Sequence, residues 1–242
     1  NLAMAKIIMV TLALEPYHPV VIGGTTYIIN TKIASIIFCF ILTLVYTALA
    51  GLTGVMLTDF VQFILAMAGA IYLAIVAVHD IGGMDYIFNQ LQKTYSPEKA
   101  AEITAILPPI PWNDFIGGLK GAFGAFMIYI TLQWWTTGST DGGGYAAQRM
   151  ISAKNEKHAF LGYLWFNIAH YCLRPWPWIV VGLCAAVLFP YFPDPVTGLM
   201  PDPEKGYILV MVKYLPHGAL GFMLASFLAA YMSTVDTQMN WG

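Results

Sequence analysis

The sequence contains very few charged residues. Of its 242 residues 10% are charged, with 11 Lys and Arg against 13 Asp and Glu, whereas a soluble domain of this length carries about 25%, or roughly 60. A soluble globule so poor in charge would expose apolar patches large enough to cause aggregation. The net charge of −2 supplies no positive field for nucleic acid. An ordinary soluble enzyme, a disordered protein and a nucleic-acid-binding protein are therefore excluded.

Cysteine is also scarce, and motifs of catalytic chemistry are missing. The three cysteines, Cys39, Cys172 and Cys184, each stand in an apolar run and form no C-x-x-C pair, so neither a disulfide framework nor a zinc site is predicted. The sequence shows no nucleophile–base pair and no zinc-type His/Glu spacing. The glycines at 142–144 lack the Lys-Ser/Thr ending of a phosphate loop. We therefore expect a protein that is not an enzyme.

Long apolar runs dominate the sequence, which is 58% hydrophobic. A membrane-spanning helix needs about 20 mostly apolar residues. We therefore expect an all-α polytopic membrane helix bundle, a single transmembrane domain over residues 1–242. About six spans are expected, at residues 1–14, 33–52, 60–78, 115–135, 160–189 and 218–238. Lys120 interrupts the fourth run near its end, where a lysine can reach the membrane surface, and the Arg174-Pro-Trp-Pro-Trp stretch predicts a kinked or broken fifth helix.

The charges of the loops predict the orientation in the cell membrane. Arg149, Lys154 and Lys157 lie between the fourth and fifth runs, whereas the loops after the third and fifth runs carry more acidic than basic residues. Because cytoplasmic loops are enriched in Lys and Arg, the loop around residues 149–157 is expected in the cytoplasm and the other two outside. Both ends of the chain then lie in the cytoplasm.

The ends of the sequence point to a longer parent. The chain begins at Asn1 rather than at a methionine, without a secretory signal or lipidation motif. It also stops soon after the last apolar run. We expect a fragment that is incomplete at both ends.

Polar groups inside apolar helices are costly, so they are the natural candidates for function. In the last run Ala230, Ser233, Thr234 and Thr237 have the spacing i, i+3, i+4 and i+7, which places them on one helix face. Such a stripe offers the oxygen ligands that a hard cation prefers. The alternative is a small-residue packing seam whose hydroxyls bond back to their own helix carbonyls.

Polar residues also stand near the third and fourth runs. Asp59 precedes the third run, where helix capping or a place in a cation route would explain an acid. Gln133, Trp134 and Trp135 end the fourth run, where the indoles fit either a solute ring or an interfacial aromatic belt.

A further polar cluster lies in the fifth run. Asn167, His170 and Arg174 stand beside Pro175 and Pro177. Either their donors satisfy carbonyls that the prolines leave free, or the cluster has a functional role.

Four stretches in order resemble the sodium:solute symporter family, which contains the sugar, proline and pantothenate symporters. The strongest is AAYMSTVDTQMN at residues 229–240, which resembles the sodium-site helix of that family. The others are YTALAGL at residues 46–52 followed by TDFVQ at residues 58–62, QRMISAK at residues 148–154, and the proline-containing run after it. Together they cover most of residues 33–240.

The resemblance implies a LeuT-type fold, in which two inverted repeats of five helices hold the site at the bilayer midplane. The six runs would be the third to eighth core helices. The resemblance assigns a sodium site to the Ala230 carbonyl and the Ser233 and Thr234 hydroxyls, completed by a first core helix outside this chain. It makes Asp59 and Thr237 weaker candidates for a cation route.

The function that the resemblance implies is sodium-coupled symport of a small polar solute such as a sugar, with Na⁺, the solute and the lipid bilayer as partners. The sixth and seventh core helices would contact the solute, which makes Gln133, Trp134, Trp135 and Tyr171 candidates. The stretch between Trp135 and Gln148 is longer and richer in glycine than in the sugar symporters, so their solute residues are not transferred. The alternative is a transporter-like solute sensor attached to a signalling domain.

Overall fold

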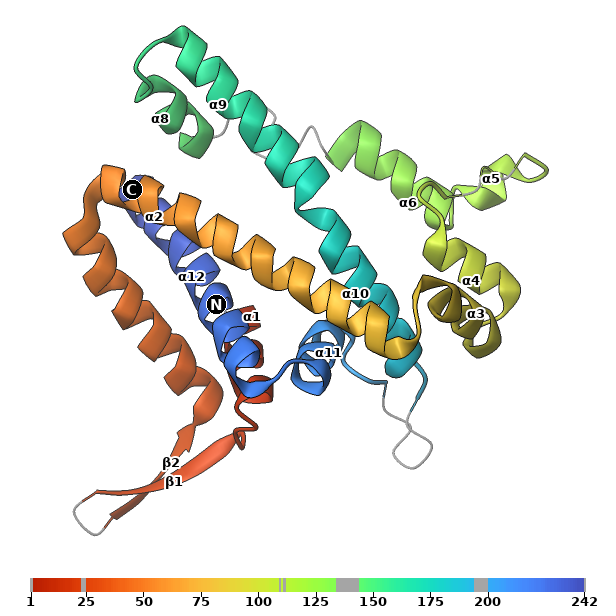
Figure 1. Ribbon diagram of the computed structural model, residues 1–242, viewed down its shortest axis with the longest axis horizontal. Helices are drawn as coiled ribbons and strands as arrows, with labels where there is room; N and C mark the ends of the chain where they lie inside the picture. Colours follow the sequence, from red (N-terminus) through yellow and green to blue (C-terminus); the bar gives the residue numbers. More distant parts are fainter. Residues whose placement is uncertain are drawn as a thin grey trace. The chain divides into compact units, whose positions relative to one another are not determined.

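The computed structural model describes residues 2–22, 25–108, 110, 112–133, 144–193 and 200–241. They are mostly helical, as Figure 1 shows, which confirms the helical membrane fold class. The chain forms two compact units. We call Asn1–Ile87 together with Ala169–Gly242 unit 1, and Phe88–Ile168 unit 2.

Unit 1 contains the helices that carry the candidate sodium site. Its elements are α1 (Leu2–Thr11), β1 (Tyr17–Ile22), β2 (Thr25–Asn30), α2 (Thr31–Ile81), η2 (Ala169–Leu173), α10 (Pro175–Leu188), η3 (Pro203–Lys205), α11 (Gly206–Tyr214) and α12 (His217–Trp241). The helix α3 (Met84–Thr94) begins in unit 1 and continues into unit 2.

A β-hairpin that the sequence did not reveal joins the first two helices. Strands β1 and β2 pair antiparallel, with Tyr17 opposite Asn30. The hairpin ends where Asn30 caps α2, because its Oδ1 accepts hydrogen bonds from the backbone N–H groups of Lys32 and Ile33 at 3.1 and 3.3 Å. The Thr31 hydroxyl closes the loop by donating to the Glu15 carbonyl at 2.6 Å.

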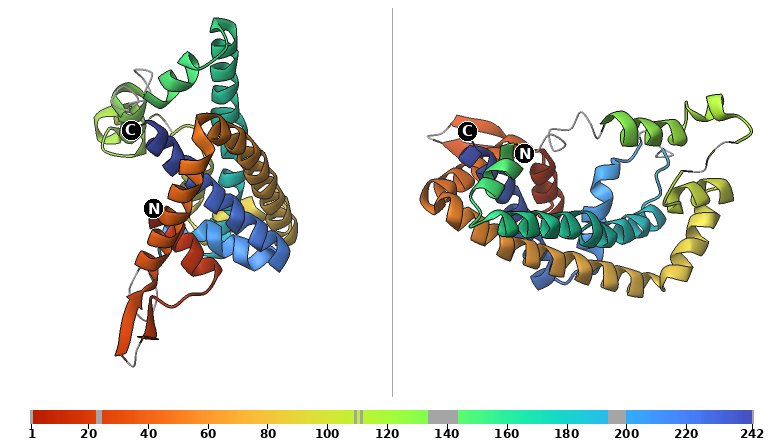
Figure 2. Two further views of the ribbon diagram at one scale, coloured as in Figure 1. Left: turned by 90° about the vertical axis from the view of Figure 1, so that its left-hand side faces the viewer. Right: turned by 90° about the horizontal axis from the view of Figure 1, so that it is seen from above.

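The second and third predicted spans lie on one helix. α2 is continuous over 51 residues, but Figures 1 and 2 show it bent sharply into two arms. The first arm carries Thr31–Val45 and the second Met56–Ile81. Near the bend the Thr58 hydroxyl donates to the Gly54 carbonyl at 3.0 Å, and glycine together with such back-bonding is a known cause of helix bending.

The core of unit 1 lies where α12 and α10 pack on α2. α12 runs antiparallel to the second arm of α2 in both views (Figures 1 and 2). Small residues permit the close approach, as is usual between membrane helices: a Cβ atom on Gly69 would collide with the Met223 sulfur. The largest fully buried side chains here include Leu73 of α2, Val181 of α10 and Met211 of α11.

Unit 2 contains the remaining helices. They are α4 (Pro97–Thr104), α5 (Phe115–Gly118), α6 (Ala122–Ile128), η1 (Tyr129–Gln133), α8 (Gly144–Ile151) and α9 (Glu156–Ile168). The run at 115–135 is not one uninterrupted helix, because α5 and α6 are separated by a turn at Lys120, whose backbone N–H donates to the Gly117 carbonyl at 3.1 Å.

The irregularity expected in the fifth run is present as a π-helical turn. α9, η2 and α10 follow one another directly, and the Arg174 backbone N–H donates to the Ala169 carbonyl at 3.0 Å, five residues back. Pro175 then occupies the first position of α10, where proline is favoured because its fixed φ suits a helix start.

Three helical segments of the described residues are long and apolar enough to cross a membrane. They are Met56–Ile81, Glu156–Leu188 and His217–Val235. Thr31–Val45 and Ala122–Leu132 are apolar but shorter.

Candidate functional site

The stripe predicted to bind sodium lies in the second half of α12. The Thr234 hydroxyl donates to the Ala230 carbonyl at 3.0 Å, so two of the three candidate oxygens are neighbours. Ser233 is half-buried, whereas Ala230 and Thr234 are exposed in the described chain. The stripe is therefore open to ligands from another segment.

The bond between Thr234 and Ala230 also has a purely structural explanation. Other hydroxyls also bond back to the carbonyl four residues earlier, among them Thr43 to Cys39 at 2.8 Å, Thr58 to Gly54 at 3.0 Å and Ser226 to Phe222 at 3.0 Å. This geometry suits both the sodium site and the packing seam.

The donor set of the stripe consists of oxygen atoms only. A carbonyl and two hydroxyls suit a hard cation, whereas imidazole and thiolate would favour a transition metal. Among the described residues there is no group of three or more His, Cys, Asp and Glu that could hold a metal. The chemistry of the stripe thus fits an alkali or alkaline-earth cation.

The capping interpretation of Asp59 is wrong. α2 continues through Asp59, so this residue is not at a helix start with free backbone N–H groups. Asp59 is half-buried. Because the second arm of α2 runs antiparallel to α12 and Gly69 meets Met223, Asp59 lies toward the same end of the helix pair as Thr237, which is also half-buried.

The candidate solute residues are only partly described. Gln133 is the last residue of η1, and its side chain lies outside the described residues, as do Trp134 and Trp135. Tyr171 lies in η2 and is 64% exposed. Its ring meets the His170 ring edge-on, with centroids 4.8 Å apart.

Arg174 has contacts that were not predicted from the sequence. Its Nη1 lies 3.2 Å from Nδ1 of His170, and its Cζ lies 4.5 Å from the centre of the Trp178 ring. The spacing of four residues between neighbours was the available signal, since such residues share a helix face. Asn167 Nδ2 donates to the Tyr163 carbonyl at 2.8 Å, which lies four residues before Asn167 and is not a carbonyl that Pro175 or Pro177 leaves free.

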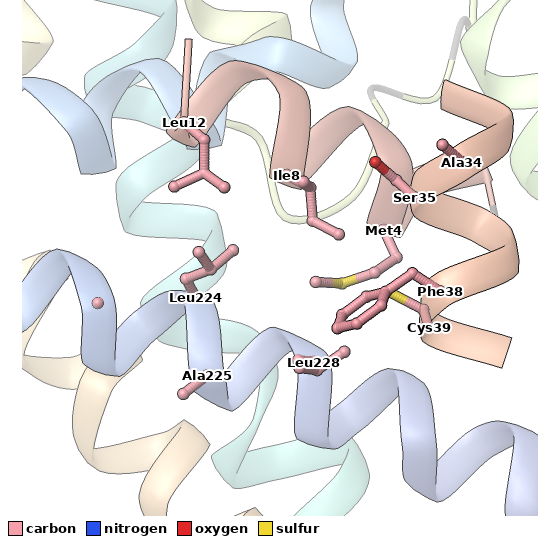
Figure 3. A pocket seen from close by; sticks show the side chains of 11 residues that line it. Met4, Ile8, Leu12, Ala34, Ser35, Phe38, Cys39, Leu224, Ala225 and Leu228 are labelled. Atoms are coloured by element: carbon pink, nitrogen blue, oxygen red, sulfur yellow. The ribbon is translucent and has the colours of Figure 1, made fainter. Parts of the chain in front are cut away.

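An apolar cavity of about 560 Å³ lies between α1, the first arm of α2 and α12 (Figure 3). Side chains such as Met4, Phe38 and Leu228 line it, and Ser35 supplies the only side-chain hydroxyl of the lining. A polar solute needs several convergent polar groups. This cavity therefore does not fit the predicted solute.

An ion pair ties α1 to the segment before α11. Lys6 Nζ donates to Asp202 Oδ2 at 3.0 Å and also contacts Glu204 Oε2. The hydrogen bond from Lys6 holds the pKa of the Asp202 carboxyl below its ordinary value.

Known proteins resemble the chain along nearly its whole length. The model of a family described as "Sodium:solute symporter family" matches residues 6–242. Sodium/glucose cotransporter 1 of Oryctolagus cuniculus is 27% identical over 237 residues, covering 85% of this chain and 33% of that protein. The sodium/mannose cotransporter of Bos taurus is 27% identical (82% and 35% covered), and sodium/myo-inositol cotransporter 2 of Homo sapiens is 25% identical (82% and 31%).

The chain thus spans about a third of the length of these relatives, which are all named as cotransporters. The family match covers far more than half of the chain, and the described helices include three that can cross a membrane. The chain therefore belongs to the sodium:solute symporter family.

Proposed function

We propose that the protein containing this chain is a sodium-coupled symporter of a small polar solute, such as a sugar, in the cell membrane. The observation that carries the proposal is the oxygen stripe of α12 in a chain of this family. The cotransporter names of the relatives support the same function. They do not favour the solute-sensor alternative.

In this proposal sodium binds the Ala230 carbonyl and the hydroxyl oxygens of Ser233 and Thr234. The Ala230 carbonyl has two lone pairs, and the Thr234 hydroxyl now uses one side of this oxygen. When sodium binds, the Thr234 proton turns away and both oxygens face the ion. The remaining ligands come from the first core helix that the family resemblance implies.

The other candidates have supporting roles. Asp59 and Thr237 lie on the cation route. Gln133, Trp134, Trp135 and Tyr171 contact the solute. Bound sodium stabilises the outward-open form by holding α12, and the solute then permits closure and release inside, because each ligand shifts the equilibrium by its preference for one state.

We also propose that residues 1–242 form a single transmembrane domain with both ends in the cytoplasm. The support is the charge asymmetry of the loops. It is the orientation that the family resemblance implies as well.

The test uses the full-length protein in lipid vesicles. Uptake of labelled glucose, mannose, myo-inositol and their acidic analogues is measured with an inward sodium gradient, and with potassium replacing sodium. The proposal predicts accumulation of at least one solute only with sodium. Equal uptake in both salts for every transported solute would contradict it.

A further inference from the structure

Arg174 is a cation deep in a segment that can cross the membrane. The segment Glu156–Leu188 has 33 residues, and Arg174 lies near its middle. Charged side chains at this depth are costly and usually serve a solute or ion pathway.

The position of Arg174 on the helix points it toward other helices. Arg174 has helical backbone angles, and α10 starts directly after it. At 100° per residue Arg174 belongs to the stripe that contains Pro177, Val181 and Cys184. These three residues are buried, in a helix that packs on α2 and α11. The guanidinium therefore belongs to the interior side of α10 rather than the lipid side.

The contacts of Arg174 stabilise its position but do not neutralise its charge. Arginine can only donate, so His170 Nδ1 accepts the hydrogen bond at 3.2 Å and the imidazole is neutral. Trp178 covers the guanidinium with its ring at 4.5 Å. None of the ion pairs among the described residues includes Arg174.

The helix-break alternative does not explain this side chain. The prolines at 175 and 177 leave carbonyls free, and a donor that satisfied one of them would be structural. Within the described part of the chain the Arg174 side chain bonds to His170 rather than to any backbone carbonyl.

We propose that Arg174 binds the carboxylate of the transported solute, so that the solute is a small organic acid such as a sugar acid. This deepens the proposed function and rests on it. The guanidinium carries five N–H donors in a planar fork that matches a carboxylate. One donor is used by His170 and one face is covered by Trp178, which leaves donors for a solute. Tyr171 is exposed and next to His170, and its hydroxyl is placed to form a hydrogen bond with a solute hydroxyl.

The experiment compares solutes that differ only in a CH₂OH group replacing the carboxylate. The pairs are glucuronate and glucose, glycerate and glycerol, and lactate and propane-1,2-diol. Sodium-driven uptake by the full-length protein in vesicles gives half-saturating concentrations, and thermal stabilisation in detergent with sodium reports binding separately.

We expect the wild type to prefer at least one carboxylate over its neutral partner. Arg174→Gln should raise the half-saturating concentration of that carboxylate at least about tenfold, the scale of one charge-assisted hydrogen bond, and that of its neutral partner far less. Arg174→Lys, which keeps the charge but loses the fork, should raise it by a smaller factor. Lys213→Gln is the matched control, because Lys213 is also stacked on aromatic rings but lies in α11, and the preference should stay unchanged.

Two results would overturn the proposal: no preference for any carboxylate in the wild type, or an equal loss of both members of a pair in Arg174→Gln. If Arg174→Gln does not fold, an unchanged preference in Arg174→Lys overturns it instead. Sodium-dependent glucose uptake without a carboxylate preference would preserve the symport function and overturn this inference. Arg174-dependent stabilisation by a carboxylate without sodium-dependent uptake of any solute would support carboxylate binding by Arg174 and overturn the proposed symport function.

Discussion

Several hydroxyl groups in the apolar helices of this protein donate a hydrogen bond to a carbonyl of their own helix, one turn earlier. Thr234 and Ser226 make the same bond on the same helix, each to the carbonyl four residues earlier. The two residues differ in their neighbours, because only Thr234 has a second hydroxyl, that of Ser233, beside it on the stripe. The spacing of these residues was readable from the sequence, since it depends on local helix geometry alone.

The ion pair between Lys6 and Asp202 gives a prediction for single residues. Lys6→Gln should lower the melting temperature at pH 7 by about 1–3 °C, because a partly exposed pair contributes little. Lys6 lowers the pKa of Asp202 from 3.8, so the contribution of this carboxylate is complete above pH 3.8 and is lost as the pH falls through the lower value in the folded protein. Thermal unfolding in detergent between pH 7 and pH 3 measures the difference between wild type and variant.

The control for this prediction is Lys99→Gln. Lys99 also forms an exposed pair, with Glu102 at 2.8 Å, but the two are three residues apart on one helix. Its removal should leave the melting temperature unchanged. A Lys6→Gln effect that increased as the pH fell would show that Asp202 is not the relevant partner.

Individual helices agree with the sequence where hydrophobic length decides them. The last run, predicted at 218–238, is the helix His217–Trp241. Departures occur where local hydrogen bonds decide the backbone path. The bend of α2, the turn at Lys120 and the hairpin β1–β2 depend on such contacts, and hydropathy does not report them.

The contact between α2 and α12 gives a prediction for helix packing. A methyl group at Gly69 would meet the flexible Met223 side chain, which can move, whereas a larger side chain cannot be accommodated. Gly69→Leu should therefore reduce the free energy of unfolding by about 1–3 kcal/mol, and Gly69→Ala by less. Adding Met223→Ala should recover part of the loss, measured as non-additive melting temperatures.

Gly182 provides the matched control for that experiment. It also lies in a membrane helix, but a Cβ atom there would have nothing within 4 Å. Gly182→Ala should be neutral or slightly stabilising. If Gly69→Leu were equally neutral, α2 and α12 would not be in contact in the membrane.

At the scale of the molecule, the segments of unit 1 that the proposal places on one side of the membrane lie toward one end. Figure 1 shows the hairpin β1–β2, helix α11 and the start of α12 toward one end, and the bend of α2 and the end of α12 toward the other. The segments at the first end are those proposed to lie outside the cell. A bent α2 can cross the membrane twice, as two separate helices would.

Cysteine labelling tests this orientation. Cys39 and Cys184 are buried and Cys172 is exposed, so Cys172→Ser is the background. Single cysteines replace Lys154 and Lys99, both exposed; the neighbouring Asn155 is avoided because it caps α9. An impermeant reagent applied to intact cells should label the Lys99 position only. Labelling at position 154 from outside, above that of the background without added cysteines, would overturn the orientation.

The candidate site could be predicted from the sequence only in part. The stripe with Ala230, Ser233 and Thr234 follows from one helical period and a family motif, so the sequence alone predicts it. The Arg174–Trp178 contact depends on side-chain conformations around a π-helical turn, and the tie between Lys6 and Asp202 joins residues 196 positions apart. The spacing of four residues shows only that Arg174 and Trp178 share a helix face, and the tie between Lys6 and Asp202 leaves no periodic signal.

The most direct measurement is the sodium dependence of uptake by the full-length protein and its α12 variants. Ser233→Ala and Thr234→Ala each remove one of the proposed oxygen ligands, which should cost about 1–3 kcal/mol and raise the half-saturating sodium concentration roughly 5- to 150-fold. Thr237→Ala should raise it less. Ser226→Ala, which removes the same kind of back-bonded hydroxyl two turns earlier, should leave it unchanged. If Ser233→Ala and Thr234→Ala both keep the sodium dependence of the wild type, the stripe is a packing seam and sodium binds elsewhere.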